Sequence, residues 1–228
     1  MKNIFLITMA LVTTAFLVSS CTLSAPPKPF SVDLKSTNYK VGETEAYFER
    51  PMSIGKIKKQ PITVFYYPGD DVVCLRFRVT YISCNQFWDR KARDAFVSAL
   101  NQYKEDFDQK NLVNKGKKSR DIYGKVDAFF TWKKTPVSYL SKGNPTIGLG
   151  YQFRQKSFLF TTTQGEARYE DPNSRDRSGT SPVLLMYFTR AQADTLAEMF
   201  SQEKLQSLIG SGISPAAIDA DFMDLDEY

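Results

Sequence analysis

The spacing of apolar residues changes along the chain, and this change constrains the fold most strongly. From Ile62 to Tyr67, and again from Val72 to Ile82, β-branched and aromatic residues are typical of two strands, with strong turn-forming residues between them. From Trp88 to Phe107 the apolar residues instead recur every three to four positions, which predicts an amphipathic helix with Asp89 as its N-cap. This part of the chain therefore reads as a β-hairpin followed by a helix.

A similar order of elements returns later in the chain. Thr146–Phe153 and Ser157–Thr163 predict a second hairpin, and Pro182–Phe188 predicts a further strand. Thr189-Arg190-Ala191-Gln192 then matches a capping box, which predicts a helix that continues to about Leu208. The recurrence reflects either an internal duplication or two similar units that share a common pattern.

These patterns predict an α+β fold. Hairpins from both halves would join one antiparallel sheet, and the two helices would pack on one face of it. The C-terminal end is acidic, because five of the last ten residues are Asp or Glu. The predicted organisation is a signal peptide at 1–20, a Pro-containing tether at 21–40, a single domain at 41–210 with possible halves at 41–110 and 121–210, and an acidic tail at 211–228.

The N-terminus carries an apolar run from Ile4 to Val18 that follows Lys2. The run is shorter than the roughly 20 residues of a membrane-spanning helix, and no Ala-x-Ala-like cleavage site follows it. Val18-Ser19-Ser20-Cys21 resembles the lipobox of bacterial lipoproteins. The resemblance implies cleavage before Cys21 and attachment of diacylglycerol and an N-acyl chain such as palmitate to Cys21.

The lipobox resemblance implies a location in the cell envelope. Thr22, and not Asp, follows the cysteine, so the outer membrane is expected rather than the inner membrane. The expected partners are the lipid bilayer, through acylated Cys21, and an unknown envelope protein or glycan. Nucleic acid is not expected outside the cytoplasm. The net charge of +5 either draws the domain to anionic headgroups or keeps it soluble.

Histidine is absent from the sequence, and this excludes several kinds of site. Ser-His-Asp and Cys-His nucleophiles and histidine-based zinc sites are ruled out, while a pair of carboxylates from distant segments remains possible. Beyond Cys21 the chain has Cys74 and Cys84, which one continuous strand would hold too far apart for a disulfide. We therefore expect two free thiols, no metal and no cofactor.

Three functions are compatible with these features. The leading hypothesis is a non-enzymatic binding or scaffold module that is held at a membrane surface. The first alternative is an envelope hydrolase that acts on polysaccharide or peptide through a carboxylate pair. The second alternative is a carrier of an apolar ligand, which would need a cavity between the sheet and the helices.

Gln164–Ser181 is the segment most suggestive of a binding role, because it is long, charged and rich in turn-forming residues. It would join two strands and lie at an edge of the sheet, either as a binding loop or as a solvated connection. Alternation in the strand from Val72 also places two arginines on the face opposite the core. The candidate binding residues are Arg168, Tyr169, Arg175 and Arg177 in the loop, and Arg76 and Arg78 on the strand.

Overall fold

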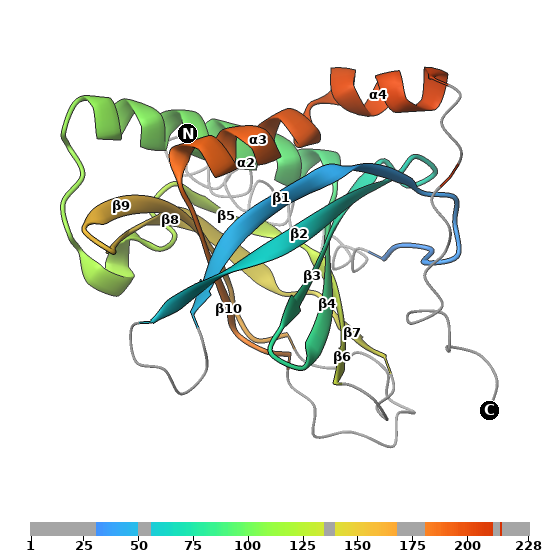
Figure 1. Ribbon diagram of the computed structural model, residues 1–228, viewed down its shortest axis with the longest axis horizontal. Helices are drawn as coiled ribbons and strands as arrows, with labels where there is room; N and C mark the ends of the chain where they lie inside the picture. The colour runs from blue at the N-terminus through green and yellow to red at the C-terminus, as the bar shows by residue number, and fades with distance from the viewer. Residues whose placement is uncertain (1–30, 50–55, 135–139, 168–180, 212–214, 216–228) are drawn as a thin grey trace, which may run out of the picture.

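The computed structural model describes residues 31–49, 56–134, 140–167, 181–211 and 215, and within them ten strands form one antiparallel sheet (Figure 1). The strands are β1 (Tyr39–Glu49), β2 (Ile57–Tyr67), β3 (Val72–Val79), β4 (Ile82–Trp88), β5 (Gly124–Asp127), β6 (Phe129–Lys134), β7 (Ser141–Gly143), β8 (Thr146–Arg154), β9 (Ser157–Gln164) and β10 (Leu184–Phe188). The helices are α2 (Arg90–Asp108), the short 3₁₀ helix η1 (Gly116–Ser119), α3 (Arg190–Phe200) and α4 (Gln202–Gly210). The predicted α+β class is confirmed.

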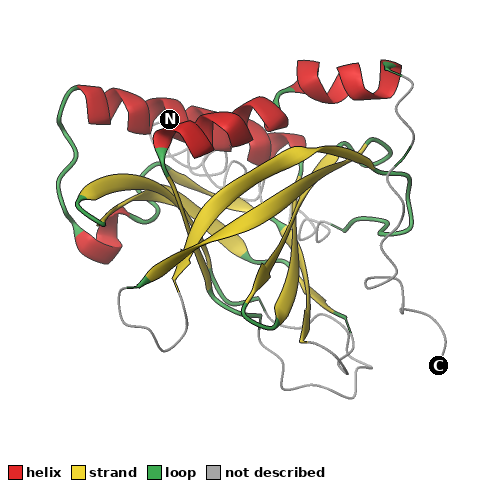
Figure 2. Ribbon diagram, viewed as in Figure 1, coloured by secondary structure: helices red, strands yellow, loops and turns green. Residues whose placement is uncertain are grey.

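The sheet curls strongly, and the consecutive strands β5 and β6 lie near its two opposite ends (Figure 2). The strand order is β5-β8-β9-β10-β1-β2-β3-β4-β6-β7. Ala128 alone separates β5, which pairs with β8, from β6, which pairs with β4. The sequence from Ile122 to Trp132 predicts one strand, and the structure divides it at Ala128. The curl gives the sheet a concave face and a convex face.

Helices α2 and α3 fill the concave face with aromatic side chains. Phe96 of α2 is fully buried at the centre of this packing. Its ring centroid lies 5.9 Å from that of Trp88, 5.3 Å from Phe160, 6.5 Å from Phe188 and 5.1 Å from Phe200. The rings therefore come from α2, from α3 and from three strands, so one contact cluster joins both helices to the sheet.

Both predicted helix starts are confirmed by their caps. Asp89 Oδ1 accepts a hydrogen bond of 2.7 Å from the Ala92 backbone N–H at the start of α2. Thr189 and Gln192 form the complete capping box at the start of α3. Trp88 lies at the end of β4 rather than in the helix, because the chain passes from strand to helix through Asp89 alone.

One buried cation on α2 was not singled out in the sequence. Arg93 is only 1% exposed, and its guanidinium donates to Asp71 Oδ1 at 2.9 Å and to the Asp71 carbonyl oxygen at 2.7 Å. It also donates to Gln202 Oε1 at 3.3 Å. Arg93 therefore ties the β2–β3 turn and α4 to α2 through a single side chain.

The predicted continuous strand from Val72 to Ile82 is wrong. Val79 pairs with Ile82, so Thr80 and Tyr81 form a two-residue turn between β3 and β4. Such turns favour Asn-Gly or Asp-Gly, because positive φ angles are strained for other residues. Thr80 nevertheless has φ +58°, and Thr80-Tyr81 was not recognised as a turn because neither residue type favours this conformation.

The hairpin changes the reason why the two cysteines stay apart. Cys74 is free and buried in a small cluster on the convex face, whereas Cys84 is free and buried in the main core. The register pairs Cys74 with Phe87 and Cys84 with Phe77. The sulfur atoms therefore lie on opposite faces of neighbouring strands, and distance along one strand is not the cause.

Both thiols are expected to resist modification until the protein unfolds. Burial raises the pKa of Cys74 to about 12 and also raises that of Cys84, so almost no thiolate exists at neutral pH. Denatured protein that was never reduced should react with a thiol reagent at both positions, as followed by mass spectrometry. A product two hydrogens lighter and unlabelled would show a disulfide and contradict the structure.

The folded part begins earlier than the predicted tether boundary. Val32 and Leu34 pack against the convex-face cluster, which contains Phe65, Phe87 and Phe129 among its members. The Asp33 backbone N–H also donates to Asp70 Oδ2 in the β2–β3 turn at 3.3 Å. The segment from residue 31 therefore lies on the convex face of β2, β3, β4 and β6 before β1 begins.

Several other boundaries differ from the expectation. The helix predicted to run to about Leu208 is broken at Ser201, whose extended backbone ends α3 and whose hydroxyl caps α4. The basic sequence of 51–60 predicts a loop, but β2 already begins at Ile57. Pro136 and Gly143 predict a loop over 133–144, but β7 lies within it. Across the described part of the chain, none of the helices has the length and apolar character needed to cross a membrane.

Candidate functional site

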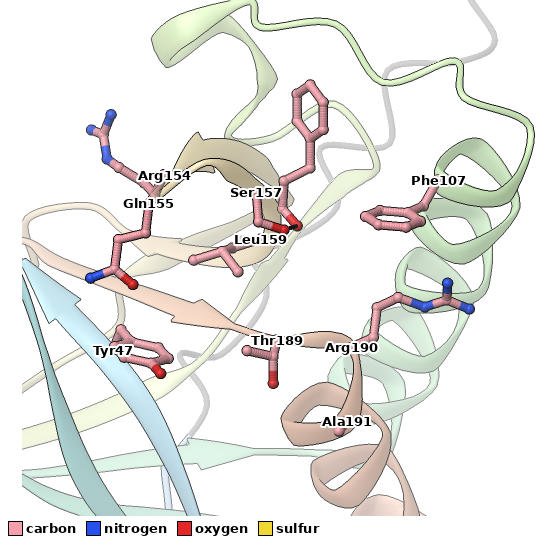
Figure 3. Close-up of a pocket in the computed structure, with 10 residues that line it drawn as sticks. Tyr47, Phe107, Arg154, Gln155, Ser157, Leu159, Thr189, Arg190 and Ala191 are labelled. Carbon is pink, nitrogen blue, oxygen red and sulfur yellow. Dashed lines mark hydrogen bonds between the residues drawn. The ribbon is translucent and has the colours of Figure 1, made fainter.

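A pocket of about 380 Å³ opens where α3 begins, beside the last turn of α2 and the β8–β9 turn (Figure 3). Its walls come from four segments that lie far apart in the sequence. The lining residues that bear on its chemistry are Tyr47, Phe107, Arg154, Gln155, Thr189 and Arg190. The pocket therefore combines aromatic surface with two guanidinium groups.

The start of α3 supplies backbone donors to this pocket. Thr189 Oγ1 accepts from the Gln192 N–H at 3.3 Å, and Gln192 Oε1 accepts from the Thr189 N–H at 2.9 Å. The N–H groups of Arg190 and Ala191, in the first turn, have no acceptor within the helix. The positive end of the helix dipole adds to them, so this side of the pocket favours an anionic group.

Arg190 lies across the gap between α3 and α2. Its Nη1 donates to Asp108 Oδ1 at 2.7 Å, and its guanidinium lies 5.0 Å from the centroid of the Phe107 ring. Both partners of this ion pair are exposed enough to exchange with solvent or with a ligand. Arg190 can therefore turn toward an incoming anion at little cost in stability.

The side chain of Arg154 packs against Tyr187 and forms a hydrogen bond with its hydroxyl group. Arg154 Nε donates to Tyr187 Oη at 3.3 Å, and the Tyr187 hydroxyl donates to Glu49 Oε2 at 3.0 Å. Burial raises the pKa of Tyr187 to about 12, against the lowering effect of Arg154. Tyr187 therefore stays protonated at neutral pH, and it orients the arginine instead of acting as a base.

The turn between β8 and β9 is strained at the edge of the pocket. Gln155 and Lys156 both have positive φ angles, of +49° and +66°. An L-residue other than Gly costs roughly 1–2 kcal/mol in this conformation, and Asn-Gly is the usual solution. Strain of this kind is concentrated at functional sites, which suggests a use for the side chains at this turn.

A second hollow, of about 460 Å³, lies on the other side of α3 and contains Glu43 and Glu45. Glu43 forms an ion pair with Lys40 at 2.6 Å, and Glu45 forms one with Lys59. All four side chains are exposed. The two carboxylates thus lack the difference in burial that separates a general acid from its partner in a catalytic pair. Within the described residues, no cluster of three or more Cys, Asp or Glu could hold a metal ion.

The loop residues proposed from the sequence, Arg168, Tyr169, Arg175 and Arg177, lie outside the described residues, as does Cys21. The base of the loop is well defined. The Ala167 N–H donates to Ser181 Oγ at 2.7 Å, and the Ser181 N–H donates to the Ala167 carbonyl oxygen at 3.0 Å. Gln86 Nε2, in β4, donates a buried hydrogen bond of 2.8 Å to Gln164 Oε1 at the end of β9. This bond fixes the strand that leads into the loop to β4.

Arg76 and Arg78 lie on the convex face of β3, as the alternation predicted, because Leu75 and Phe77 face the main core. Arg76 Nε donates to Asn85 Oδ1 at 3.1 Å, and its guanidinium lies 4.3 Å from the centroid of the Phe65 ring. Figure 1 shows β3 on a different side of the molecule from the tip of β9. The structure thus separates these arginines from the pocket.

A family model described as "Uncharacterised Treponema protein" matches residues 31–207. The chain belongs to this Treponema family. The match begins at the segment that packs on the convex face and ends within α4, so it covers all the strands of the described sheet. No curated protein and no solved structure matches the chain.

Proposed function

We propose that this member of the Treponema family is an envelope lipoprotein, anchored through acylated Cys21, that acts as a non-enzymatic binding module. The lipobox resemblance supports the anchor, and Thr22 supports the outer membrane as its location. The proposed binding site is the pocket at the start of α3. The proposed partner is an envelope protein or glycan that presents an anionic group to this pocket.

One observation carries the choice of site: Arg154, Arg190 and the first turn of α3 line one pocket with aromatic walls. The two guanidinium groups lie at opposite sides of this pocket (Figure 3). Arg154 and Arg190 come from a hairpin turn and a helix start, so the fold brings together cations that the sequence keeps apart. The volume falls within the range of small-ligand sites. A side chain or sugar with both apolar surface and a negative charge fits this chemistry.

The two alternative functions have less support from the same residues. A carrier needs space between the sheet and the helices, but the ring of Phe96 and its four aromatic neighbours occupies the centre of the concave face. A hydrolase needs two acids with different environments, whereas Glu43 and Glu45 are both exposed and ion-paired. Neither alternative is therefore our proposal.

The proposed site can be tested by capture of partners from envelope extracts. Replacing both cations, as Arg154→Gln with Arg190→Gln, should weaken binding of the captured partner at least tenfold, about 1.4 kcal/mol. The control is Lys117→Gln with Lys118→Gln, which makes the same change in net charge at exposed positions of η1. Equal affinity of the two double variants would reject the pocket as the binding site.

The loop between β9 and β10 is the competing site within the same proposal. Residues 168–180 can be replaced by a short Gly-Ser linker while Ala167 and Ser181 are kept, because these two residues close the base of the loop. We expect a melting temperature within about 2 °C of the wild type, since the hydrogen-bonded base is unchanged. Binding that survives this replacement assigns the contact to the pocket, and a tenfold loss would assign it to Arg168, Tyr169, Arg175 and Arg177 instead.

We also propose that the two halves of the domain are related by duplication. In support, the order β1, β2, β3, β4 and α2 matches the order β5/β6, β8, β9, β10 and α3, with β7 as an additional strand in the second set. Strand β1 pairs with β10 as β6 pairs with β4, and Asp89 and Thr189 cap equivalent helices. A solved structure of a family member should superpose the halves in this order, and failure to do so would contradict the duplication.

A further inference from the structure

Strands β3, β4, β6 and β7 contribute cations and no acid to the convex face, on which Asp33 of the N-terminal segment also lies. None of these four strands contains Asp or Glu. The register places Arg76, Asn85, Thr131 and Lys142 in one row across the strands, and Arg78, Ser83 and Lys133 in the next. Neighbouring strands lie about 4.8 Å apart, so the four cations share one compact surface although two come from β3 and two from β6 and β7.

These side chains point away from the core. Phe77, Cys84 and Trp132 alternate with them and belong to the main core, so Arg78 and its neighbours face the opposite way. Arg78 and Lys142 are exposed, and Arg76 and Lys133 are partly exposed. We define Arg76, Arg78, Lys133 and Lys142 as the basic face.

An exposed aromatic residue lies at the edge of the basic face. Tyr81, at the tip of the β3–β4 turn, is 58% exposed. Its neighbour Thr80 has φ +58°, which is unusual for a β-branched residue and costs stability. Tyrosine is enriched at membrane–water interfaces, where its ring and its hydroxyl meet apolar and polar surroundings.

The N-terminal segment leaves the folded domain beside the basic face. Val32 packs on the cluster that contains Cys74, Phe87 and Phe129, and these residues form the cross-strand row next to Arg76, Asn85 and Thr131. Nine residues lie between Cys21 and Ser31, so ten Cα–Cα steps connect the two. Even fully extended they reach about 35 Å, so an acyl anchor on Cys21 would hold this side of the domain close to the bilayer.

We propose that the basic face lies on anionic phospholipid headgroups when the protein is anchored. The inference rests on the anchor in the proposed function, and it adds an orientation: β3, β4, β6 and β7 face the membrane. Charge complementarity and the short connection to Cys21 both select the lipid surface as the occupant. The start of α3, which lines the pocket, lies on another side of the molecule from these strands (Figure 1).

Vesicle binding by the unacylated mature chain, residues 21–228, tests the basic face without the anchor. Wild-type protein should bind phosphatidylcholine vesicles that contain phosphatidylglycerol, and should bind much less to phosphatidylcholine alone. Arg78→Glu with Lys142→Glu should lower binding to the anionic vesicles at least tenfold, because each cation near an anionic surface adds to the electrostatic attraction. Lys117→Glu with Lys118→Glu, which makes the same change in net charge on η1, should leave most of the binding intact.

A fluorescent reporter tests the orientation separately. Trp88 and Trp132 are buried and give a constant background. Tyr81→Trp should shift its emission to the blue when anionic vesicles are added, and Phe153→Trp, at an exposed position near the β8–β9 turn, should not.

Three outcomes would overturn the inference: no binding to anionic vesicles, equal loss in both charge variants, or equal blue shifts at both reporters. Each leaves the proposed function standing, because acylation of Cys21 and partner capture are measured independently. If binding were lost equally in both charge variants, the attraction would depend on net charge and not on this face.

Discussion

Replacing Phe96 with alanine is expected to lower the free energy of unfolding by about 3–5 kcal/mol. Phe96 is fully buried and contacts rings from β4, β9, β10 and α3, so its loss leaves a cavity where both helices meet the sheet. For a domain of this size the melting temperature should fall by roughly 10 °C. Denaturant unfolding followed by tryptophan fluorescence measures the change.

Phe153→Ala is the matched control, because the same side chain is 40% exposed at the end of β8. It should cost less than about 1.5 kcal/mol, since a large part of that side chain is already in contact with water and its removal leaves no closed cavity. Similar losses for the two variants would mean that the concave face is not packed around Phe96. A cavity able to hold an apolar ligand would then return as a functional possibility.

Asp71→Asn is expected to destabilise the protein by about 3 kcal/mol, because it removes the charged partner of the buried Arg93. Asn tolerates the positive φ of +51° at this position, so the change acts through charge and not through backbone strain. Thermal and denaturant unfolding measure the loss. Asp194→Asn is the control, since its ion pair with Lys104 is exposed and should contribute no more than about 1 kcal/mol.

The Asp71–Arg93 pair should also give the protein a specific acid sensitivity. Burial raises the pKa of Asp71, but hydrogen bonds and charge from Arg93, with Tyr66 and Arg90, outweigh it and hold the pKa below its usual value. The stabilisation is therefore complete above the unfolded pKa of about 3.9 and is lost as the pH falls through the folded pKa. Asp71→Asn should lose less stability than the wild type between neutral pH and pH 3, and an equal loss would contradict this role.

The fold was predictable wherever local chemistry and tertiary packing agree. Asp89 and Thr189 carry cap chemistry in their own side chains, so both helix starts were found from the sequence. The β3–β4 turn was missed because Thr80-Tyr81 carries no turn signal, and its conformation is imposed by the pairing of Val79 with Ile82. The break at Ala128 was missed for a similar reason, since it depends on β4 and β8 lying on either side of one stretch.

The pocket was less predictable than the fold. Its cations, Arg154 and Arg190, are more than thirty residues apart, and the antiparallel pairing of β9 with β10 brings the β8–β9 turn to the start of α3. The capping box at Thr189 was the one local signal near the site. Arg93 was missed because its position on the apolar face of α2 becomes favourable only when Asp71 and Gln202 arrive from other elements.

Mass spectrometry of the mature protein from envelope membranes tests the central claim most directly. If the protein is a lipid-anchored module, the N-terminal peptide begins at Cys21 and carries a thioether-linked diacylglycerol with an N-acyl chain. Cys21→Ser should then remain unprocessed and take up no labelled fatty acid, because only the thiol can accept the diacylglycerol. A mature N-terminus at another residue, or an unmodified Cys21, would contradict the account.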